Sequence, residues 1–297
     1  MKKPVFTGSG LAMITPMKSD GSVNYAEIDR LVEYQIEHGT DAIIACGTTG
    51  EAPTLEDDEH LEVIAHVAKR VRGRIPVVGG TGSNNTAHAV MMSKEAADLG
   101  ADALLVVTPY YNKTSQDGLV ASYTAIADAT PLPVIMYNVP SRTGVNILPE
   151  TAKKLSAHPH INAIKEASGN ISQIAKTAAL CGSELNIYSG NDDQIVPILS
   201  LGGKGVISVL AHVAPQQTHD ICALWFDGKS AESAAMQLKY LDLCNALFCD
   251  VNPIPVKAAM NMLGWDVGVC RLPLVPPSDA SLAKIRAALT EAGLTNA

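Results

Sequence analysis

Several signals that would assign a chain to a particular class are missing from this sequence. Clustered Lys and Arg are absent, and 22 basic residues against 30 acidic ones give a net charge of −8, which argues against a nucleic-acid partner. No apolar run approaches the ~20 residues of a membrane span. The first residues lack the apolar region and cleavage site of a secretory signal. We therefore expect neither a nucleic-acid partner nor a membrane anchor nor export.

The cysteines also lack the spacing of a metal site. No Cys-x-x-Cys pair and no histidine cluster accompanies them. Scattered thiols are typical of a protein kept reduced, so we expect a cytoplasmic location and no metal. With 47% hydrophobic and 18% charged residues, the composition predicts a substantial core and no disorder.

One repeated pattern is present: an amphipathic helix, a break at Gly or Pro, and a short apolar strand. An opening strand at residues 9–14 and seven repeats make eight strands. The repeats begin at His38, Arg72, Leu99, Pro131, Pro159, Cys181 and Gly202. Alternating strands and helices predict parallel strands joined by right-handed crossovers. Eight such units favour an α/β fold of the closed (β/α)8 TIM-barrel type over an open sheet.

Local signals set the expected element boundaries. Asn24 is positioned to cap the first helix, with Glu27 as its capping-box partner and Gly39 after its end. Thr54 is expected to cap the second helix. We divide the chain into a catalytic barrel and a C-terminal helical domain, or appendage. The expected boundaries are 1–228 for the barrel and 229–297 for the appendage, with helices near 230–249, 255–263 and 279–292.

Lys165 is the most informative single residue. In a strand starting at Ile161, alternation places Ile161, Ala163 and Lys165 on one inward face and Ile164 on the other. An amine held there loses solvation, which lowers its pKa, and only a neutral amine attacks a ketone to form a Schiff base. The ordinary alternative is a strand-end lysine whose ammonium reaches into water.

The expected loops at the carboxyl ends of the strands carry hydroxyls, phenols, one arginine and one lysine. In a barrel of this kind the active site lies on these loops. They contain no pair of carboxylates with a facing histidine, which argues against metal-assisted hydrolysis. The loops are 47–51, 80–84, 108–112, 137–144, 165–170 and 189–193.

Six motifs, in order and on the expected elements, carry a resemblance to a known family. They are Thr15-Pro16, Gly47-Thr48-Thr49-Gly50-Glu51, Thr108-Pro109-Tyr110-Tyr111-Asn112, Tyr137-Asn138-Val139-Pro140-Ser141-Arg142-Thr143-Gly144, Ile164-Lys165-Glu166-Ala167 and Asn252-Pro253-Ile254-Pro255-Val256-Lys257. Nearly end to end, the chain resembles the 4-hydroxy-tetrahydrodipicolinate synthase (dihydrodipicolinate synthase) family of pyruvate-dependent class I (Schiff-base) aldolases.

The resemblance implies a role for each catalytic candidate. Lys165 matches the amine that condenses with pyruvate, and Tyr137 matches the phenol that transfers protons. A phenol does this poorly unless it belongs to a hydrogen-bonded relay. Thr48 and Tyr111 match the relay partners, with Tyr111 reaching in from a neighbouring subunit.

The resemblance also implies substrate-binding residues. Thr49 matches the residue that holds the pyruvate carboxylate, while Gly190 and Ile207 match positions lining the pyruvate pocket. Arg142 matches the guanidinium that receives L-aspartate β-semialdehyde, whose carboxylate suits its fork of donors.

The implied protein is a cofactor-free lyase and a homo-oligomer, a homotetramer built as a dimer of dimers. Its implied reaction joins pyruvate to L-aspartate β-semialdehyde and gives 4-hydroxy-tetrahydrodipicolinate, the entry step of diaminopimelate and lysine biosynthesis.

Candidate regulatory residues follow from the same resemblance. Lysine-inhibited members bind the inhibitor at a subunit interface through positions matching Asn84, Tyr110 and His60. The position that carries an acid in sensitive members is His88 here. An imidazole cannot replace that negative charge, so we expect weak or absent inhibition by lysine, although Asp57 offers a substitute anion.

Alternatives stay open at this point. A sister aldolase, such as N-acetylneuraminate lyase or a keto-deoxy-sugar aldolase, shares the lysine and the tyrosine, although Ser141-Arg142-Thr143 weighs against it. A catalytically idle barrel that senses a keto acid is the rival from another class. Thr48-Thr49 could also be simply part of a turn, and Tyr111 could be a ring on the surface. Gly80-Thr81-Gly82 resembles a phosphate loop only faintly.

Overall fold

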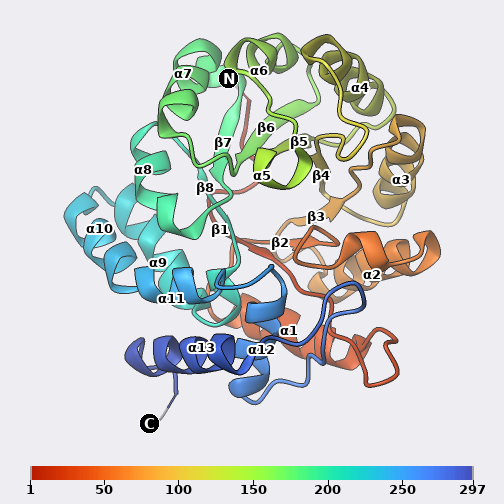
Figure 1. The fold of residues 1–297 in the computed structure, drawn as a ribbon. Coiled ribbons are helices and arrows are strands. Elements are labelled where there is room, and N and C mark those ends of the chain that lie inside the picture. The colour runs from red at the N-terminus through yellow and green to blue at the C-terminus, as the bar shows by residue number, and fades with distance from the viewer. Residues whose placement is uncertain (1, 296–297) are drawn as a thin grey trace.

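The computed structural model describes residues 2–295 and contains a closed barrel of eight parallel strands, in which β8 pairs back to β1. Figure 1 looks onto the ring of strands and the helices around it. The strands are β1 (Gly8–Ala12), β2 (Ala42–Ala45), β3 (Val77–Gly80), β4 (Ala103–Val107), β5 (Val134–Asn138), β6 (Ile161–Glu166), β7 (Asn186–Ser189) and β8 (Gly205–Ser208). The predicted TIM barrel is confirmed.

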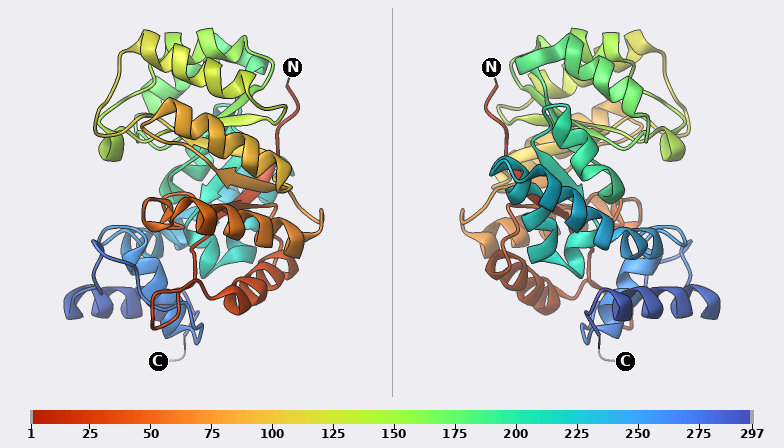
Figure 2. Two further views of the ribbon diagram at one scale, coloured as in Figure 1. Left: turned by 90° about the vertical axis from the view of Figure 1, so that its right-hand side faces the viewer. Right: turned by 90° about the vertical axis from the view of Figure 1, so that its left-hand side faces the viewer.

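Helices between the strands form the outer ring. They are α1 (Tyr25–Glu37), α2 (Asp57–Val71), α3 (Thr86–Asp98), α4 (Gln116–Asp128), α6 (Pro149–Ser156), α7 (Ile171–Cys181), α8 (Ile195–Ser200) and α9 (Pro215–Phe226). Single 3-10 turns occur at η1 (Ala52–Thr54), η2 (Gly182–Glu184), η3 (Asp192–Gln194) and η4 (Leu210–His212). The short helix α5 (Pro140–Thr143) projects from the end of β5 on the same side of the molecule as the C-terminal helices, opposite the N-terminus (Figure 2).

The start of α1 confirms one capping prediction and corrects another. The Asn24 side chain accepts from the Glu27 amide, as expected, and Gly39 has the positive φ (83°) predicted after the helix. The reciprocal capping-box bond is absent among the described residues. The Glu27 carboxylate instead accepts from the Arg30 guanidinium and the Asp266 amide, because the Asn24 N–H is already bonded to the Pro16 carbonyl.

The predicted cap of α2 is wrong. Glu56, and not Thr54, occupies the N-cap position, while Asp57, Asp58 and Glu59 fill the acidic first turn. Thr54 ends the 3-10 turn η1, and its hydroxyl donates locally to the Glu51 carbonyl (3.0 Å). Buried, extended Leu55 then separates this turn from the helix.

Two apolar layers hold the barrel together. One fills the interior and includes Ala163, Ile135 and the stacked rings of Phe6 and Tyr188; the other lies between the strands and the surrounding helices. The predicted face of Ile161 is wrong, since this residue packs in the outer layer. The β5–β6 register passes from Val134–Ile161 to Ile135–Ala163, so Asn162 is an extra residue that breaks the alternation. The alternation holds from Ala163 to Lys165.

Four further helices follow the barrel: α10 (Ser230–Lys239), α11 (Leu241–Ala246), α12 (Ile254–Met262) and α13 (Asp279–Glu291). The single helix expected over 230–249 is wrong, because the chain turns at buried Tyr240. The two halves have different partners: α10 packs against α9, and α11 packs against α13. The helices α12 and α13 pack against each other and lie at the bottom of Figure 1.

Within residues 2–295, no helix combines the length and apolarity needed to cross a membrane. All six cysteine thiols are free, and four of them are buried: Cys46, Cys181, Cys222 and Cys244.

Candidate active site

Lys165 lies at the inward-facing end of β6, next to the last residue of the strand. Its side chain is only 6% exposed, and it pairs in register with Tyr137 on β5 and Tyr188 on β7. Burial lowers the pKa of Lys165 from 10.5 to about 8, although the charge of Asp192 opposes the shift and that of Arg142 adds to it. At pH 7 roughly one such amine in ten is neutral, against fewer than about one in a thousand for an ordinary lysine. The predicted desolvation is confirmed, and the alternative of an amine reaching into water is excluded.

Tyr137 is the neighbour of this amine. The Lys165 Nζ lies 4.3 Å from the centroid of the Tyr137 ring. Burial raises the pKa of the Tyr137 phenol, while the charge of Arg142 and a hydrogen bond with Thr48 act in the opposite direction. The side chains of Thr48, Arg142 and Lys165, which the sequence placed on three different loops, therefore all act on the Tyr137 phenol.

The space beside the Lys165 amine depends on Gly190, the residue that follows β7. Gly190 follows that strand, and its amide donates to the Glu166 carbonyl (2.8 Å). A Cβ at Gly190 would lie 2.7 Å from the Ala167 Cβ and 3.1 Å from the Lys165 Cε, so any side chain here crowds the amine. Ile207 on β8 is buried in the same interior layer as Tyr137. Both predicted pocket residues thus border the barrel interior.

Thr49 and Arg142 are joined by a residue that the sequence argument missed. Thr49 is buried, and its hydroxyl accepts from the Asn252 amide Nδ2 (2.9 Å). The backbone carbonyl of Asn252 accepts from the Arg142 Nη2 (3.4 Å). Asn252 belongs to the segment between α11 and α12, so the C-terminal helices contribute to the site. Its one sequence signal is its place in the motif of residues 252–257.

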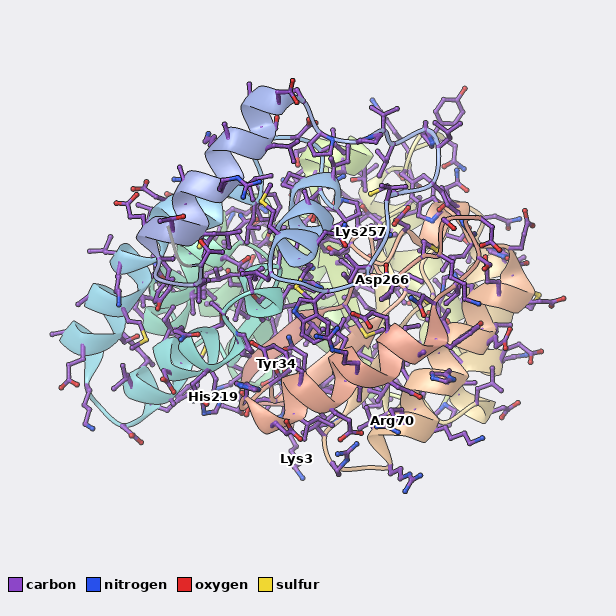
Figure 3. All side chains as sticks on the ribbon, turned by 90° about the horizontal axis from the view of Figure 1, so that it is seen from below. Lys3, Tyr34, Arg70, His219, Lys257 and Asp266 are labelled. Atoms are coloured by element: carbon purple, nitrogen blue, oxygen red, sulfur yellow. The ribbon has the colours of Figure 1, made fainter. Side chains whose placement is uncertain are left out.

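A buried ion pair between Glu51 and Lys257 holds the loop of residues 47–51, which carries Thr49. Glu51, two residues after Thr49, has a positive φ of 57°, and its carboxylate lies 2.5 Å from the Lys257 Nζ. Both side chains are almost fully buried. The Arg271 amide also donates to Glu51 (2.8 Å). Figure 3 labels Lys257 on α12, at the junction of the C-terminal helices with the barrel. The loop therefore has its shape fixed by residues more than 200 positions away.

Asp192 is a second group that the sequence argument did not single out. Its Oδ2 accepts from the amides of Val209 (3.0 Å) and Leu210 (2.9 Å), while its Oδ1 is buried without a hydrogen-bond partner among the described residues. Burial raises the pKa of this carboxyl, and the charge of Lys165 lowers it. Asp192 supplies negative potential to the amine from the β7–α8 connection.

Tyr111 stands apart from the other predicted catalytic residues. Its side chain is 92% exposed, and its backbone has a positive φ of 68°, unusual for a residue other than glycine. A ring this exposed is not packed against its own barrel, so it is not brought to Lys165 within the protomer.

A cavity of about 420 Å³ unites catalytic and regulatory candidates. Thr48, Tyr137 and Arg142 line one part of it, and Asp57, His60, His88 and Tyr110 line another. His60, one of the regulatory candidates, is buried, and its Nε2 donates to the Gly80 carbonyl (2.7 Å). Burial lowers the pKa of His60.

Asp57 on α2 and His88 on α3 face each other. The His88 Nε2 lies 2.9 and 3.0 Å from the two Asp57 carboxylate oxygens. The backbone carbonyl of Asn84, on the adjoining loop, accepts from the Asn112 side chain (2.9 Å). The anion that Asp57 offers is thus already engaged by the imidazole.

In the part of the chain that the structure describes, no three His, Cys, Asp or Glu side chains are grouped so that they could hold a metal ion. The arrangement instead offers a buried amine of lowered pKa, a neighbouring phenol, hydroxyl donors and a guanidinium. These groups suit Schiff-base chemistry on a keto acid with a second, anionic substrate.

Comparisons with known proteins agree with this chemistry. The model of the dihydrodipicolinate synthetase family matches residues 5–292. A curated 4-hydroxy-tetrahydrodipicolinate synthase from Caldicellulosiruptor saccharolyticus is 57% identical over 291 residues, covering 98% of each chain.

Two solved structures are similar over the whole barrel and the C-terminal helices. The dihydrodipicolinate synthase of Thermotoga maritima is 44% identical with a TM-score of 0.96, covering 98% of this chain and 100% of that one. The enzyme of Acinetobacter baumannii, described in complex with pyruvate, is 42% identical with a TM-score of 0.95, covering 97% of this chain and 99% of that one.

Proposed function

Since the chain belongs to the dihydrodipicolinate synthetase family, we propose that Lys165 carries pyruvate as a Schiff base while the enzyme condenses it with L-aspartate β-semialdehyde. The product is 4-hydroxy-tetrahydrodipicolinate, and the reaction, that of a lyase, opens diaminopimelate and lysine biosynthesis. The observation that carries the proposal is the placement of Lys165, buried and with its pKa lowered to about 8.

The chemistry proceeds through successive covalent forms of Lys165. The neutral amine adds to the pyruvate ketone, and loss of water gives the Schiff base. Removal of a proton from the methyl carbon gives an enamine, whose carbon forms a bond to the aldehyde of the second substrate. The amino group of that substrate then displaces Lys165 as the ring closes, which frees the lysine for another turnover. Tyr137, within reach of the Lys165 Nζ, carries the protons, and Thr48 connects it to the relay.

The substrates divide between two groups of residues. Thr49, Gly190 and Ile207 receive pyruvate, with Thr49 as donor to its carboxylate. Arg142, at the mouth on α5, receives the carboxylate of the semialdehyde through two parallel hydrogen bonds. The guanidinium also lowers the pKa of both Lys165 and Tyr137.

Borohydride reduction in the presence of pyruvate tests the nucleophile. We expect one covalent adduct, on Lys165, located by peptide mass mapping. Lys257 is the matched comparison, because it is equally buried but paired with Glu51. An adduct on another lysine, or none in a folded enzyme, contradicts the mechanism.

A two-substrate assay tests the second substrate. Pyruvate offered with L-aspartate β-semialdehyde should turn over, and pyruvate with N-acetylmannosamine should not. In Arg142→Ala, use of the semialdehyde should fall by a factor of tens to a hundred, about 2–3 kcal/mol, while pyruvate trapping changes little. Equal losses for both substrates would make Arg142 a structural residue, and turnover of the sugar would favour a sister aldolase.

Tyr111 supports a homo-oligomer in which subunits complete each other's sites. A ring that is 92% exposed on a strained loop is suited to contact a neighbour and not its own barrel. We propose a tetramer built as a dimer of dimers. Mixing Tyr111→Phe with Lys165→Ala subunits should restore activity in exchanged oligomers. Failure to restore it, with exchange proven by native mass spectrometry, places Tyr111 in its own subunit's site.

Regulation by lysine should be weak or absent. His88 replaces an acid that would receive the ammonium of the inhibitor, and the His88–Asp57 contact engages the nearest substitute anion. Asn84, Tyr110 and His60 complete the candidate regulatory site. A lysine titration at limiting pyruvate decides the matter: half-inhibition below about a millimolar, near −4 kcal/mol of binding free energy, would overturn this proposal. His88→Glu is the change expected to restore inhibition.

Two expectations stay predictions. Six free thiols are consistent with a reducing, cytoplasmic setting. The division into a barrel at 1–228 and a helical domain at 229–297 awaits a test, for which limited proteolysis near residue 229 is suited.

A further inference from the structure

We propose that Asn252, supplied by the C-terminal helices, is a positioning residue for the carboxylate of pyruvate and acts through the hydroxyl of Thr49. This inference rests on the proposed role of Thr49 in pyruvate binding. The observation behind it is a single side chain, almost fully buried, that joins the two loops assigned to the two substrates.

The direction of the Thr49 hydrogen bond is the first step. A threonine hydroxyl has one proton to donate and two acceptor sites. The Asn252 Nδ2 donates to the Thr49 Oγ1 at 2.9 Å, so one acceptor site is filled and the hydroxyl proton is left for another acceptor. A carboxylate is acceptor-only, so a hydroxyl held in this state is oriented to bind it. Donation into the hydroxyl oxygen also strengthens its own donation.

The fixed position of Asn252 is the second step. Its backbone carbonyl accepts from Arg142, which ties this residue to the guanidinium assigned to the semialdehyde. A few residues later, the amide of Lys257 donates to the Pro253 carbonyl, and the Lys257 ammonium pairs with buried Glu51. Glu51 lies two residues from Thr49. The C-terminal helices therefore hold both partners of the Asn252–Thr49 bond.

The side chain and the backbone of Asn252 each act on the binding of a different substrate. Its amide group acts on the pyruvate side through Thr49, whereas its carbonyl acts on the semialdehyde side through Arg142. A substitution at residue 252 removes the first contact and keeps the second. The effect should therefore fall selectively on pyruvate.

Asn252→Asp gives the sharpest test, because it keeps the shape of the side chain and reverses its hydrogen bond. A carboxylate accepts the Thr49 proton and adds a negative charge close to the incoming pyruvate. We expect pyruvate affinity to fall about thirtyfold in this variant and about fivefold in Asn252→Ala, with the KM for the semialdehyde within about twofold of the original. The pyruvate dependence of borohydride trapping on Lys165 measures this affinity without turnover.

Lowering the pH sharpens the Asn252→Asp result. Burial raises the pKa of an aspartic acid at this position above its ordinary value near 4, so the carboxylate takes up a proton as pH falls. The protonated acid donates to Thr49 again, so the pyruvate affinity of the variant relative to that of the original enzyme should recover as pH falls from about 8 to about 5. A merely structural role gives no such recovery. Asn245→Asp is the matched control: it adds the same charge at an exposed side chain of the preceding helix, α11, and should leave pyruvate affinity unchanged.

A double-mutant cycle identifies the route of action. In a Thr49→Val background, Asn252→Ala should reduce pyruvate affinity by less than about twofold, because the hydroxyl it acts through is gone. This cycle also decides the question if Asn252→Asp fails to fold by circular dichroism. The inference is overturned if Asn252→Asp binds pyruvate as well as or better than Asn252→Ala does. It is also overturned if Asn252→Ala keeps its full effect on pyruvate affinity in the Thr49→Val background. Absence of trapping in the unmodified enzyme would instead overturn the proposed function.

Discussion

Lys165 and Lys257 are two buried lysines in one molecule with opposite surroundings. Lys165 is 6% exposed, and the carboxylate of Asp192 acts on it through space, with no ion-pair contact to Lys165 among residues 2–295. Lys257 is 2% exposed and lies 2.5 Å from the Glu51 carboxylate. Burial penalises the charged amine at both positions, and only Lys257 has a bonded anion to offset that cost.

The difference is the one expected between the proposed reactive lysine and a structural lysine. Without a bonded anion, Lys165 responds to desolvation by lowering its pKa to about 8, which makes neutral amine available near neutral pH. With Glu51 and the Val269 carbonyl as partners, Lys257 has its ammonium bonded in place, and it fastens the loop that carries Thr48 and Thr49. This contrast supports the proposal that Lys165, and not the equally buried Lys257, is the nucleophile.

The largest effect should follow from removing the reactive lysine. Lys165→Ala should lose activity on the order of a thousandfold or more, because no other amine is positioned to form the Schiff base. Its circular dichroism spectrum should stay close to that of the original enzyme. Lys153→Ala, at an exposed position on α6, serves as the control. Turnover within tenfold of the original would break the distinction between the two lysines.

Removing the structural lysine should act on stability. Lys257→Met leaves the Glu51 carboxylate buried without its partner, and we expect the free energy of unfolding to fall by about 3–5 kcal/mol. Urea unfolding measures the loss, with exposed Lys94→Met as the control. Adding Glu51→Gln to Lys257→Met should recover part of the stability, since no uncompensated charge remains. A loss below about 1 kcal/mol would show that the pair contributes little.

The third effect is a pH dependence that follows from the lowered pKa of Lys165. Its pKa is about 8 in the folded state and 10.5 as an ordinary lysine, so between these values the unfolded chain binds more protons. The lysine therefore destabilises the fold below pH 8, and this cost is relieved as pH rises toward 10.5.

Urea unfolding of Lys165→Met and of the original enzyme across this pH range measures the effect. The original should gain up to about 3 kcal/mol relative to the variant as pH rises. Lys284→Met, on an exposed face of α13, should show no such trend. A constant difference between Lys165→Met and the original would mean that the amine is not desolvated in solution.

Much of the barrel and of the reactive centre follows from short-range sequence patterns. Strand alternation predicted that Lys165 faces inward, and its amine lies in the interior next to Tyr137. The eight strand–helix repeats predicted the closed sheet. Each of these depends on residues close in the sequence, where side-chain period and turn chemistry dominate.

The missed features depend on contacts that no local pattern encodes. Asn252 reaches Thr49 across 203 positions of the chain. The bulge at Asn162 follows from the pairing of β5 with β6, and the break at Tyr240 from the different partners of α10 and α11. Thr54 had the right residue type for a cap, but its hydroxyl was already used by the Glu51 carbonyl. Tertiary pairing decided the positions of Asn252, Asn162 and Tyr240, whereas a competing local turn decided that of Thr54.

Heating should affect the Glu51–Lys257 pair differently from the apolar contacts around it. Hydration of charged groups becomes less favourable as temperature rises, so the cost of keeping this pair away from water declines, whereas hydrophobic stabilisation levels off. The contact between residues 47–51 and the C-terminal helices should consequently lose less stability on warming than a contact made only of apolar side chains would. We expect the loop that carries Thr48 and Thr49 to be among the last parts of the barrel mouth to loosen at high temperature.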